Sequence, residues 1–186
     1  MDTTFFEGPW PKQWTHDYEV GRHTVQWRQR ASDRDGIFAG AAFAAPASQA
    51  QTWALANDYS DVGAKTPGVT AVRYLENTQT HQLVEIDAKV LWKRLTLKFE
   101  IERDPPNSVR FRLLNRTIGD YRGVFRLAPA AHGTQVEFIT WLDPAVRMPK
   151  GLILYTERVV MLQSIRNFLR TVRPTPSSTE KRSNST

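Results

Sequence analysis

The chain has no cysteine among its 186 residues, so disulfide bonds, thiolate catalysis and cysteine-based zinc sites are excluded. It also has no apolar run of about 18 residues, the length that a membrane-spanning helix needs. Residues 1–14 lack the basic segment followed by an apolar segment that marks a secretory signal. From the last two absences we expect a cytoplasmic protein without a transmembrane helix.

Recognisable catalytic signatures are missing as well. The chain contains no nucleophile elbow, no phosphate-binding loop and no dinucleotide-binding fingerprint, so hydrolase and nucleotide chemistry lose their usual sequence signals. Its four histidines lack the spacing of metal ligands, so no metal site is expected and no cofactor is predicted. Glu85 and Asp87 fall on the outward face of a predicted strand, where a catalytic carboxylate pair is not expected. The sequence therefore supports a binding function better than a reaction.

What the chain does contain is ordinary for one globular domain, with 40% hydrophobic and 24% charged residues. The net charge of +6 is uneven, because residues 149–186 carry seven basic and two acidic side chains, whereas residues 1–148 are nearly neutral. A basic terminus suits an anionic membrane surface or nucleic acid, but it also suits the C-terminal end of a helix followed by a solvated tail. We favour the second interpretation, so nucleic acid is not an expected partner.

One long helix is predicted from Pro149 to Val172. Proline suits a first helical position, and Pro174 ends the pattern. Glu157 and Arg158 are predicted to point away from the apolar face. That face consists of residues that recur at three- and four-residue intervals: Leu152, Tyr155, Val159, Leu162, Leu169 and Val172. Such a helix is about 35 Å long, enough to cross a small domain. Residues 174–186 are rich in Ser, Thr and Pro, and we expect them to form a disordered tail.

Upstream of this helix the apolar period is mostly two, which predicts strands. Clean alternation favours antiparallel pairing with one dry and one wet face, and strands of eight to ten residues favour a strongly curved sheet. The predicted strands are 23–30, 37–45, 69–76, 83–92, 95–102, 109–113, 121–127 and 134–142, with helical segments at 47–57 and 58–64. Residues 1–21 carry unpatterned aromatic side chains, so we expect an N-terminal arm that packs against the body.

The connection between the fourth and fifth predicted strands presents a conflict. A tight turn at Lys93–Arg94 sets Asp87 opposite Glu100 and Lys89 opposite Lys98, and like charges that face each other across a strand pair are unfavourable. Lysine and arginine are also poor residues for a two-residue turn. We therefore expect a bulge or a longer loop at this point.

The order of elements and several short motifs resemble one known superfamily. The motifs are Ala45-Pro46-Ala47, Trp53-Ala54-Leu55, Asn57-Asp58-Tyr59, Pro67-Gly68-Val69 and Gly133-Thr134-Gln135-Val136. Together they resemble the helix-grip superfamily of START lipid-transfer domains, birch-pollen-type allergens, polyketide cyclases and coenzyme-Q-binding proteins. The resemblance covers residues 22–173. It implies an α+β fold in which a curved antiparallel sheet wraps around the long C-terminal helix, with two short helices after an early strand.

The resemblance also implies a cavity between the sheet and the C-terminal helix. A curved sheet closed by one helix leaves an interior that side chains fill only in part, unless residues such as Leu152 and Tyr155 occupy it. The implied ligand is a small hydrophobic molecule, for example a lipid, a quinone or a polyketide-like compound. The candidate pocket residues are Tyr59, Tyr74, Ile86, Ala88, Phe99, Phe111, Tyr121, Phe125, Phe138, Leu152, Tyr155 and Val159.

Two alternatives stay open. The first is an enzyme of the polyketide cyclase or aromatase type, which a buried charged side chain pointing into the pocket would distinguish; the sequence assigns none to that position. The second is an interaction protein that docks on a membrane surface or an acidic partner through a stripe of arginines on the outer strand face. That stripe consists of Arg110, Arg112, Arg122 and Arg126. A solvated face is the simpler interpretation of these four residues.

Overall fold

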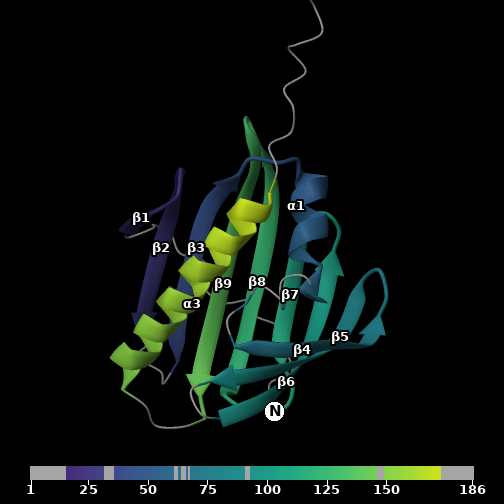
Figure 1. The fold of residues 1–186 in the computed structure, drawn as a ribbon, viewed down its shortest axis with the longest axis vertical. Helices are drawn as coiled ribbons and strands as arrows, with labels where there is room; N and C mark the ends of the chain where they lie inside the picture. Colours follow the sequence, from purple (N-terminus) through teal and green to yellow (C-terminus); the bar gives the residue numbers. More distant parts are fainter. Residues whose placement is uncertain are drawn as a thin grey trace, which may run out of the picture.

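The computed structural model describes residues 16–31, 36–60, 63, 66, 68–90, 93–145 and 149–172. In these residues nine strands form one sheet, with helices α1 and α3 lying against it (Figure 1). The elements are β1 (His16–Val20), β2 (His23–Ala31), β3 (Ile37–Ala45), α1 (Gln49–Ala56), β4 (Val69–Asn77), β5 (His81–Val90), β6 (Lys93–Asp104), β7 (Ser108–Leu113), β8 (Gly119–Ala130), β9 (Gly133–Pro144) and α3 (Lys150–Thr171).

All neighbouring strands are antiparallel, in the order β1-β2-β3-β9-β8-β7-β6-β5-β4. The long-range pairing of β3 with β9 sets Ala41 opposite Phe138 and joins the N-terminal strands to the meander. Helix α3 runs along one face of the sheet in front of β2, β3 and β9, whereas β4, β5 and β6 cross the other end (Figure 1). The predicted α+β helix-grip architecture is confirmed.

The main core lies where α3 approaches β1, β2 and β3. Ala39 and Ala41 on β3 are buried, and their small side chains let Met161 and Ile165 of α3 pack closely. Trp27 on β2 is fully buried in the same cluster. The alanine-rich sequence of this strand therefore marks the close approach of another element. Each large apolar side chain buried here contributes about 1.5–3 kcal/mol to folding.

The predicted inward face of α3 is wrong at its N-terminal half. Leu152 is 50% exposed, Tyr155 58% and Val159 47%, so these three side chains face outward. The residues that pack inward follow a neighbouring row: Ile153, Met161, Ile165 and Leu169. That row has four-residue spacing, but Glu157 interrupts it, and apolar residues lie on both sides of it. Periodicity alone therefore selected an adjacent face.

The expected bulge or longer loop between β5 and β6 is also wrong. Val90 pairs with Lys93, so residues 91–92, which lie outside the described residues, join the two strands. This register sets Asp87 opposite Thr96, and the Thr96 hydroxyl donates a 2.7 Å hydrogen bond to the Asp87 carboxylate. The register of the strands, rather than an irregular turn, separates Asp87 from Glu100, although it sets Lys89 opposite Arg94.

Part of the predicted N-terminal arm belongs to the sheet itself. Residues 16–20, predicted to belong to it, form the edge strand β1, which turns into β2 through Gly21 with a positive φ of 67°. Val20 is buried, and Tyr18 packs against the main core. Residues 1–15 and the predicted tail at 174–186 lie outside the described residues. In the predicted second short helix, residues 59, 60 and 63 are helical, and residues 61, 62 and 64 also lie outside the description.

Candidate functional site

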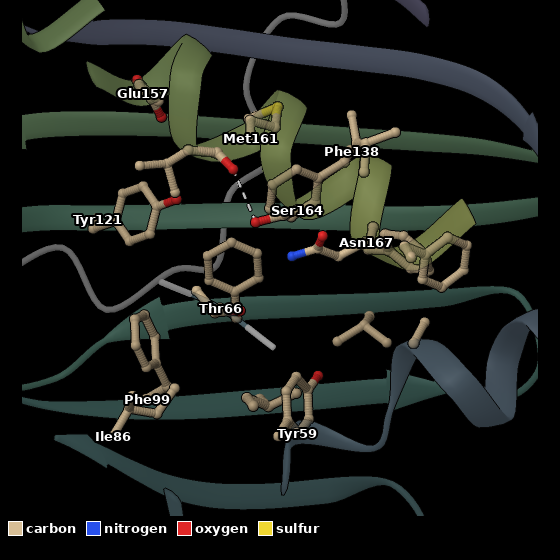
Figure 2. Close-up of a pocket in the computed structure, with 18 of the residues that line it drawn as sticks. Tyr59, Thr66, Ile86, Phe99, Tyr121, Phe138, Glu157, Met161, Ser164 and Asn167 are labelled. Atoms are coloured by element: carbon tan, nitrogen blue, oxygen red, sulfur yellow. Dashed lines mark hydrogen bonds between the residues drawn. The ribbon is translucent and has the colours of Figure 1, made fainter. Parts of the chain in front are cut away.

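A cavity of about 660 Å³ lies between the sheet and α3 (Figure 2). This volume falls within the range of roughly 300–1,000 Å³ that is usual for small-molecule sites. Strands β5 to β9 supply an apolar wall that includes Ile86, Phe99 and Ile101, and Leu55 and Ala56 of α1 close one end. Helix α3 supplies the opposite wall with Ile153, Thr156, Glu157, Val160, Met161, Ser164, Ile165, Asn167, Phe168 and Thr171.

Aromatic rings give the sheet side of the cavity its shape. The Phe111 ring stacks on Phe138 with centroids 5.9 Å apart and meets the edge of Phe99 at 6.0 Å. Tyr121 lies 5.7 Å from Phe111 in the same network. Such contacts contribute about 0.5–1.5 kcal/mol each beyond their buried area, so the wall is formed before any ligand arrives. Gly123 on β8 is required here, because a Cβ at this position would collide with the Phe111 ring.

The structure brings most of the predicted pocket residues to this cavity. Those that line it are Tyr59, Ile86, Phe99, Phe111, Tyr121, Phe125 and Phe138. Period-two alternation located the strand residues among them, because β5 to β9 keep their dry face toward α3. Leu152, Tyr155 and Val159 do not line the cavity, since the rotation of α3 turns them outward.

Tyr74 and Ala88 are also absent from the lining. The Tyr74 hydroxyl accepts a 3.0 Å hydrogen bond from the backbone N–H of Tyr59, and the two rings lie 6.5 Å apart. Tyr74 therefore positions Tyr59 instead of facing the cavity itself. Ala88 is opposite Val69 and Leu95 in the neighbouring strands, and it is only partly buried toward the end of the sheet.

A polar cluster interrupts the apolar wall at one side of the cavity. The Thr140 hydroxyl on β9 donates a 2.6 Å hydrogen bond to Oε1 of Glu157 on α3. Oε2 of Glu157 is buried and has no hydrogen-bond partner among the described residues. Burial raises the pKa of the Glu157 carboxyl, while the bond from Thr140 acts against that rise. Burial also raises the pKa of Tyr121, and the nearby Glu157 charge raises it further, while a hydrogen bond between Tyr121 and Thr140 acts against the rise.

Sequence reasoning missed Glu157, which was predicted to point away from the apolar face. Its place four residues after Ile153 and four before Met161 is the signal that puts it in the buried row. It is also the one acidic residue of α3. A charged side chain at the centre of a buried helix face is uncommon, and such residues concentrate at functional sites.

Other polar groups on the cavity face of α3 are bonded to their own helix. The Ser164 hydroxyl donates to the carbonyl of Val160 at 2.9 Å, the bond drawn in Figure 2. The Thr171 hydroxyl donates to the carbonyl of Asn167 at 3.0 Å. These two hydroxyl protons are committed to helix carbonyls, whereas Oε2 of Glu157 has no hydrogen-bond partner among the described residues.

The arginines on the outer face are matched by acids of the same sheet. Arg112 forms an ion pair with Glu100 at 2.5 Å, and Arg122 forms one with Asp120 at 2.5 Å. The strand register sets Arg110 opposite Glu102 and Arg126 opposite Glu137. Their mutual repulsion is therefore relieved within the molecule, and this face supplies no specific argument for an anionic partner.

The described residues contain no group of three histidine or carboxylate side chains arranged to hold a metal ion. None of the described helices has the length and apolar character to cross a membrane.

Comparison with known proteins assigns the family. A family model described as polyketide cyclase / dehydrase and lipid transport matches residues 45–169, from the end of β3 almost to the end of α3. The chain belongs to this family. No curated protein sequence matches the chain.

Solved structures of this fold confirm the architecture. A STAR-related lipid transfer protein from Xanthomonas axonopodis is 18% identical, with a TM-score of 0.65 over 84% of this chain and 98% of that one. Human STARD10 is 8% identical, with a TM-score of 0.65 over 84% and 71% of the two chains. The Zhui aromatase/cyclase from Streptomyces sp. R1128 is 17% identical, with a TM-score of 0.61 over 73% and 94%. At these identities the likeness shows the fold of this family and not the ligand.

Proposed function

We propose that the chain binds a small hydrophobic molecule, such as a lipid, a quinone or a polyketide-like compound, in the cavity between the sheet and α3. The observation that supports this most is the preformed aromatic wall, in which Phe99, Phe111 and Phe138 face about 660 Å³ of unfilled space. A folded core normally fills such space with side chains. A ligand would remove the rings from water without requiring the sheet to rearrange.

The energy available from this cavity is enough for useful affinity. A ligand that removes on the order of 400 Å² of apolar surface from water gains about 10 kcal/mol at 25 cal/mol per Å². Association costs at least about 4 kcal/mol in lost translational and rotational freedom. A net gain of about 6 kcal/mol corresponds to dissociation constants between millimolar and micromolar, before any polar contact is counted.

The test measures whether the cavity accepts an apolar probe. The neutral dye N-phenyl-1-naphthylamine is titrated into the protein, and its fluorescence should rise with a dissociation constant in the micromolar range. Native mass spectrometry of protein purified from a lipid-containing host should show a noncovalent adduct. Absence of both signals would overturn the proposal.

Two variants of α3 locate the binding. Ser164→Phe adds a ring on the cavity face and should weaken dye binding about tenfold or more, because it fills the space that the dye needs. Leu152→Phe adds a ring on the exposed face of the same helix and should leave the affinity unchanged. Equal effects of the two variants would place the dye outside the cavity.

A second candidate is an enzyme of the polyketide cyclase or aromatase type, and Glu157 favours it. A carboxyl whose pKa is raised by burial suits proton transfer to or from a bound substrate, and Tyr121 lies nearby as a hydrogen-bonding group that stays neutral. Mass spectrometry of a bound poly-β-ketone before and after incubation separates the two functions. A carrier releases the compound unchanged, whereas an enzyme releases a cyclised product with the loss of water.

A further inference from the structure

The cavity has one polar position that its own side chains leave incomplete. Oε2 of Glu157 lies buried beside the apolar wall without a hydrogen bond from any described residue. Thr140 holds the carboxyl in place, because its hydroxyl proton is committed to Oε1 at 2.6 Å. The second oxygen is therefore fixed in orientation and available. A buried carboxyl oxygen without a partner is costly, so it is normally satisfied by water or by a ligand.

Tyr121 supplies the complementary group. It lies on β8 and lines the same cavity, and its hydroxyl is hydrogen-bonded to Thr140, the residue that also bonds Glu157. Rotation about the phenolic C–O bond can turn this proton from Thr140 to a bound hydroxyl. Burial, and then the nearby Glu157 charge, raise the pKa of Tyr121 against the opposing effect of the Thr140 hydrogen bond, so the phenol keeps its proton throughout the physiological pH range. Figure 2 shows Glu157 and Tyr121 on one side of the cavity, with Asn167 and Tyr59 on the other.

The chemistry of this pair distinguishes between ligand groups. A hydroxyl both donates and accepts, so it can donate to Oε2 of an ionised Glu157 and accept from Tyr121 at the same time. If Glu157 is protonated, the same hydroxyl accepts from it instead. An ammonium group has no lone pair with which to accept a hydrogen bond from Tyr121, and a carboxylate is repelled by the charge of ionised Glu157. A carbonyl group cannot donate a hydrogen bond to an ionised Glu157.

We propose that the ligand of this cavity carries a hydroxyl group on an apolar body, and that Glu157 and Tyr121 bind this hydroxyl and orient the ligand while Thr140 holds the Glu157 carboxyl in place. This inference rests on the proposed function, since it concerns a ligand in the same cavity. The hydroxyl is held at the Glu157 side, and the apolar body extends along the aromatic wall of β6, β7 and β9 toward α1. An alcohol, a phenol and a sterol share this chemistry.

The test uses fluorescent probes that share one apolar body and differ in one group. 1-Pyrenebutanol carries a hydroxyl, 1-butylpyrene carries none, 4-(1-pyrenyl)butylamine is cationic, and 1-pyrenebutanoic acid is anionic. We expect the protein to bind 1-pyrenebutanol about tenfold more tightly than 1-butylpyrene, the effect of one good hydrogen bond to a carboxyl group. The anionic probe should bind more weakly than both.

Variants of Glu157 and Tyr121 test whether these residues cause the preference for 1-pyrenebutanol. Glu157→Met should remove the preference for 1-pyrenebutanol while 1-butylpyrene still binds, and Glu157→Gln should retain part of it because the amide still forms a hydrogen bond. Tyr121→Phe should reduce the preference, whereas Tyr155→Phe, which removes an exposed hydroxyl from α3, should leave it unchanged. Thermal melting of each variant confirms that it is folded.

The outcomes separate this inference from the proposed function. Equal binding of 1-pyrenebutanol and 1-butylpyrene by the wild-type protein would overturn the inference and leave the proposed function intact. A preference for the amine would also overturn it, in favour of a cationic ligand. A preference for the hydroxyl probe that survives Glu157→Met would overturn the inference, because another part of the cavity would then bind the hydroxyl. Binding of none of the probes would count against the cavity as a ligand site.

Discussion

Helix α3 meets the two ends of the sheet in different ways. Beside β1, β2 and β3 it packs closely, because Ala39 and Ala41 leave room for Met161 and Ile165. Opposite β5 to β8 it stands away from the sheet, and large aromatic rings face the cavity. At both ends, every second side chain along a strand faces the α3 side of the sheet. What differs is the size of the side chains that face the helix, and this difference turns one end into core and the other into a site.

The comparison shows how one helix can serve both stability and binding. The residues that anchor α3 lie on the row that contains Ile165 and Leu169, and they need no ligand to stay buried. Next to that row, Val160 and Thr156 line the cavity yet remain exposed, so the cavity reaches the surface beside α3. The closely packed end therefore holds the helix in place while the other end stays open to a small molecule.

The largest expected effect comes from truncating one large side chain at each end. Trp27→Ala should lower the free energy of unfolding by about 3–5 kcal/mol, because Trp27 is fully buried and its loss leaves a new void. Phe111→Ala should cost only about 1–2 kcal/mol, since one face of that ring already borders an open space. Chemical denaturation measures both values. Equal losses would mean that the cavity end is packed as tightly as the core in solution.

A smaller effect should follow from adding the same bulk at each end. Ala41→Leu should destabilise the protein by about 1–3 kcal/mol, because Ala41 is fully buried beneath α3 and a larger side chain would push the helix away. Ala56→Leu, at the end of α1 where the residue lines the cavity, should change stability by less than about 0.5 kcal/mol. Ala56→Leu should instead weaken binding of an apolar probe. Calorimetric melting and dye titration report the two properties separately.

The strand wall of the cavity could be predicted from the sequence because strands have a strict period of two. Once Phe99 was assigned inward, Ile101 and Leu97 followed, and the same reasoning placed Phe111, Phe125 and Phe138. The register of β5 and β6 could not be predicted in the same way. A connection at residues 93–94 and one at residues 91–92 keep every apolar residue on the same face, because they differ by two residues in position. The choice between them depends on contacts such as that of Asp87 with Thr96.

The helix wall was less predictable for a different reason. Apolar residues cover more than half of the N-terminal part of α3, so a stripe through Leu152 and Tyr155 fits about as well as one through Ile153 and Met161. Only the small residues of β3, which lie more than a hundred positions earlier in the chain, decide which stripe is buried. Strand β1 was missed because its five residues include only two apolar side chains that pack inward.

The polar cluster at the cavity end makes the stability of the protein depend on pH. Burial raises the pKa of Glu157 above its ordinary value of 4.5, so the folded protein holds this proton more tightly than the unfolded chain does. The stability that Glu157 contributes is therefore complete below pH 4.5 and is lost as the pH rises through the folded-state pKa, by about 1.4 kcal/mol for each unit of elevation. Tyr121 is the titratable group that faces Glu157 from the sheet, and it stays neutral in this range.

Glu157→Gln removes this titration and should become progressively more stable than the wild-type protein as the pH rises above 4.5. Denaturation of both proteins at several pH values between about 4 and 8 measures the difference. Arg158, the next residue, is directed to Tyr18 and Tyr155, so it does not neutralise the carboxyl. A difference that stays constant with pH would mean that water hydrates Glu157 in the cavity as it does on the surface.

The smallest expected effect lies on the outer face of β5 and β6, opposite the face that lines the cavity. His81 lies between Glu76, 3.0 Å from its Nδ1, and Glu100, 3.4 Å from its Nε2, and these carboxylates raise the pKa of its ring above 6.5. Because the folded-state pKa is raised, the stabilisation is complete below pH 6.5 and is lost as the pH rises through the folded-state value. His81→Gln should therefore cost more stability at pH 6 than at pH 9, by less than about 1 kcal/mol, because the ion pairs are partly exposed. Denaturation in high salt should reduce the difference further, since solvent ions screen surface charges but do not reach the buried Glu157. A loss that is the same at both pH values would instead assign the role of His81 to packing.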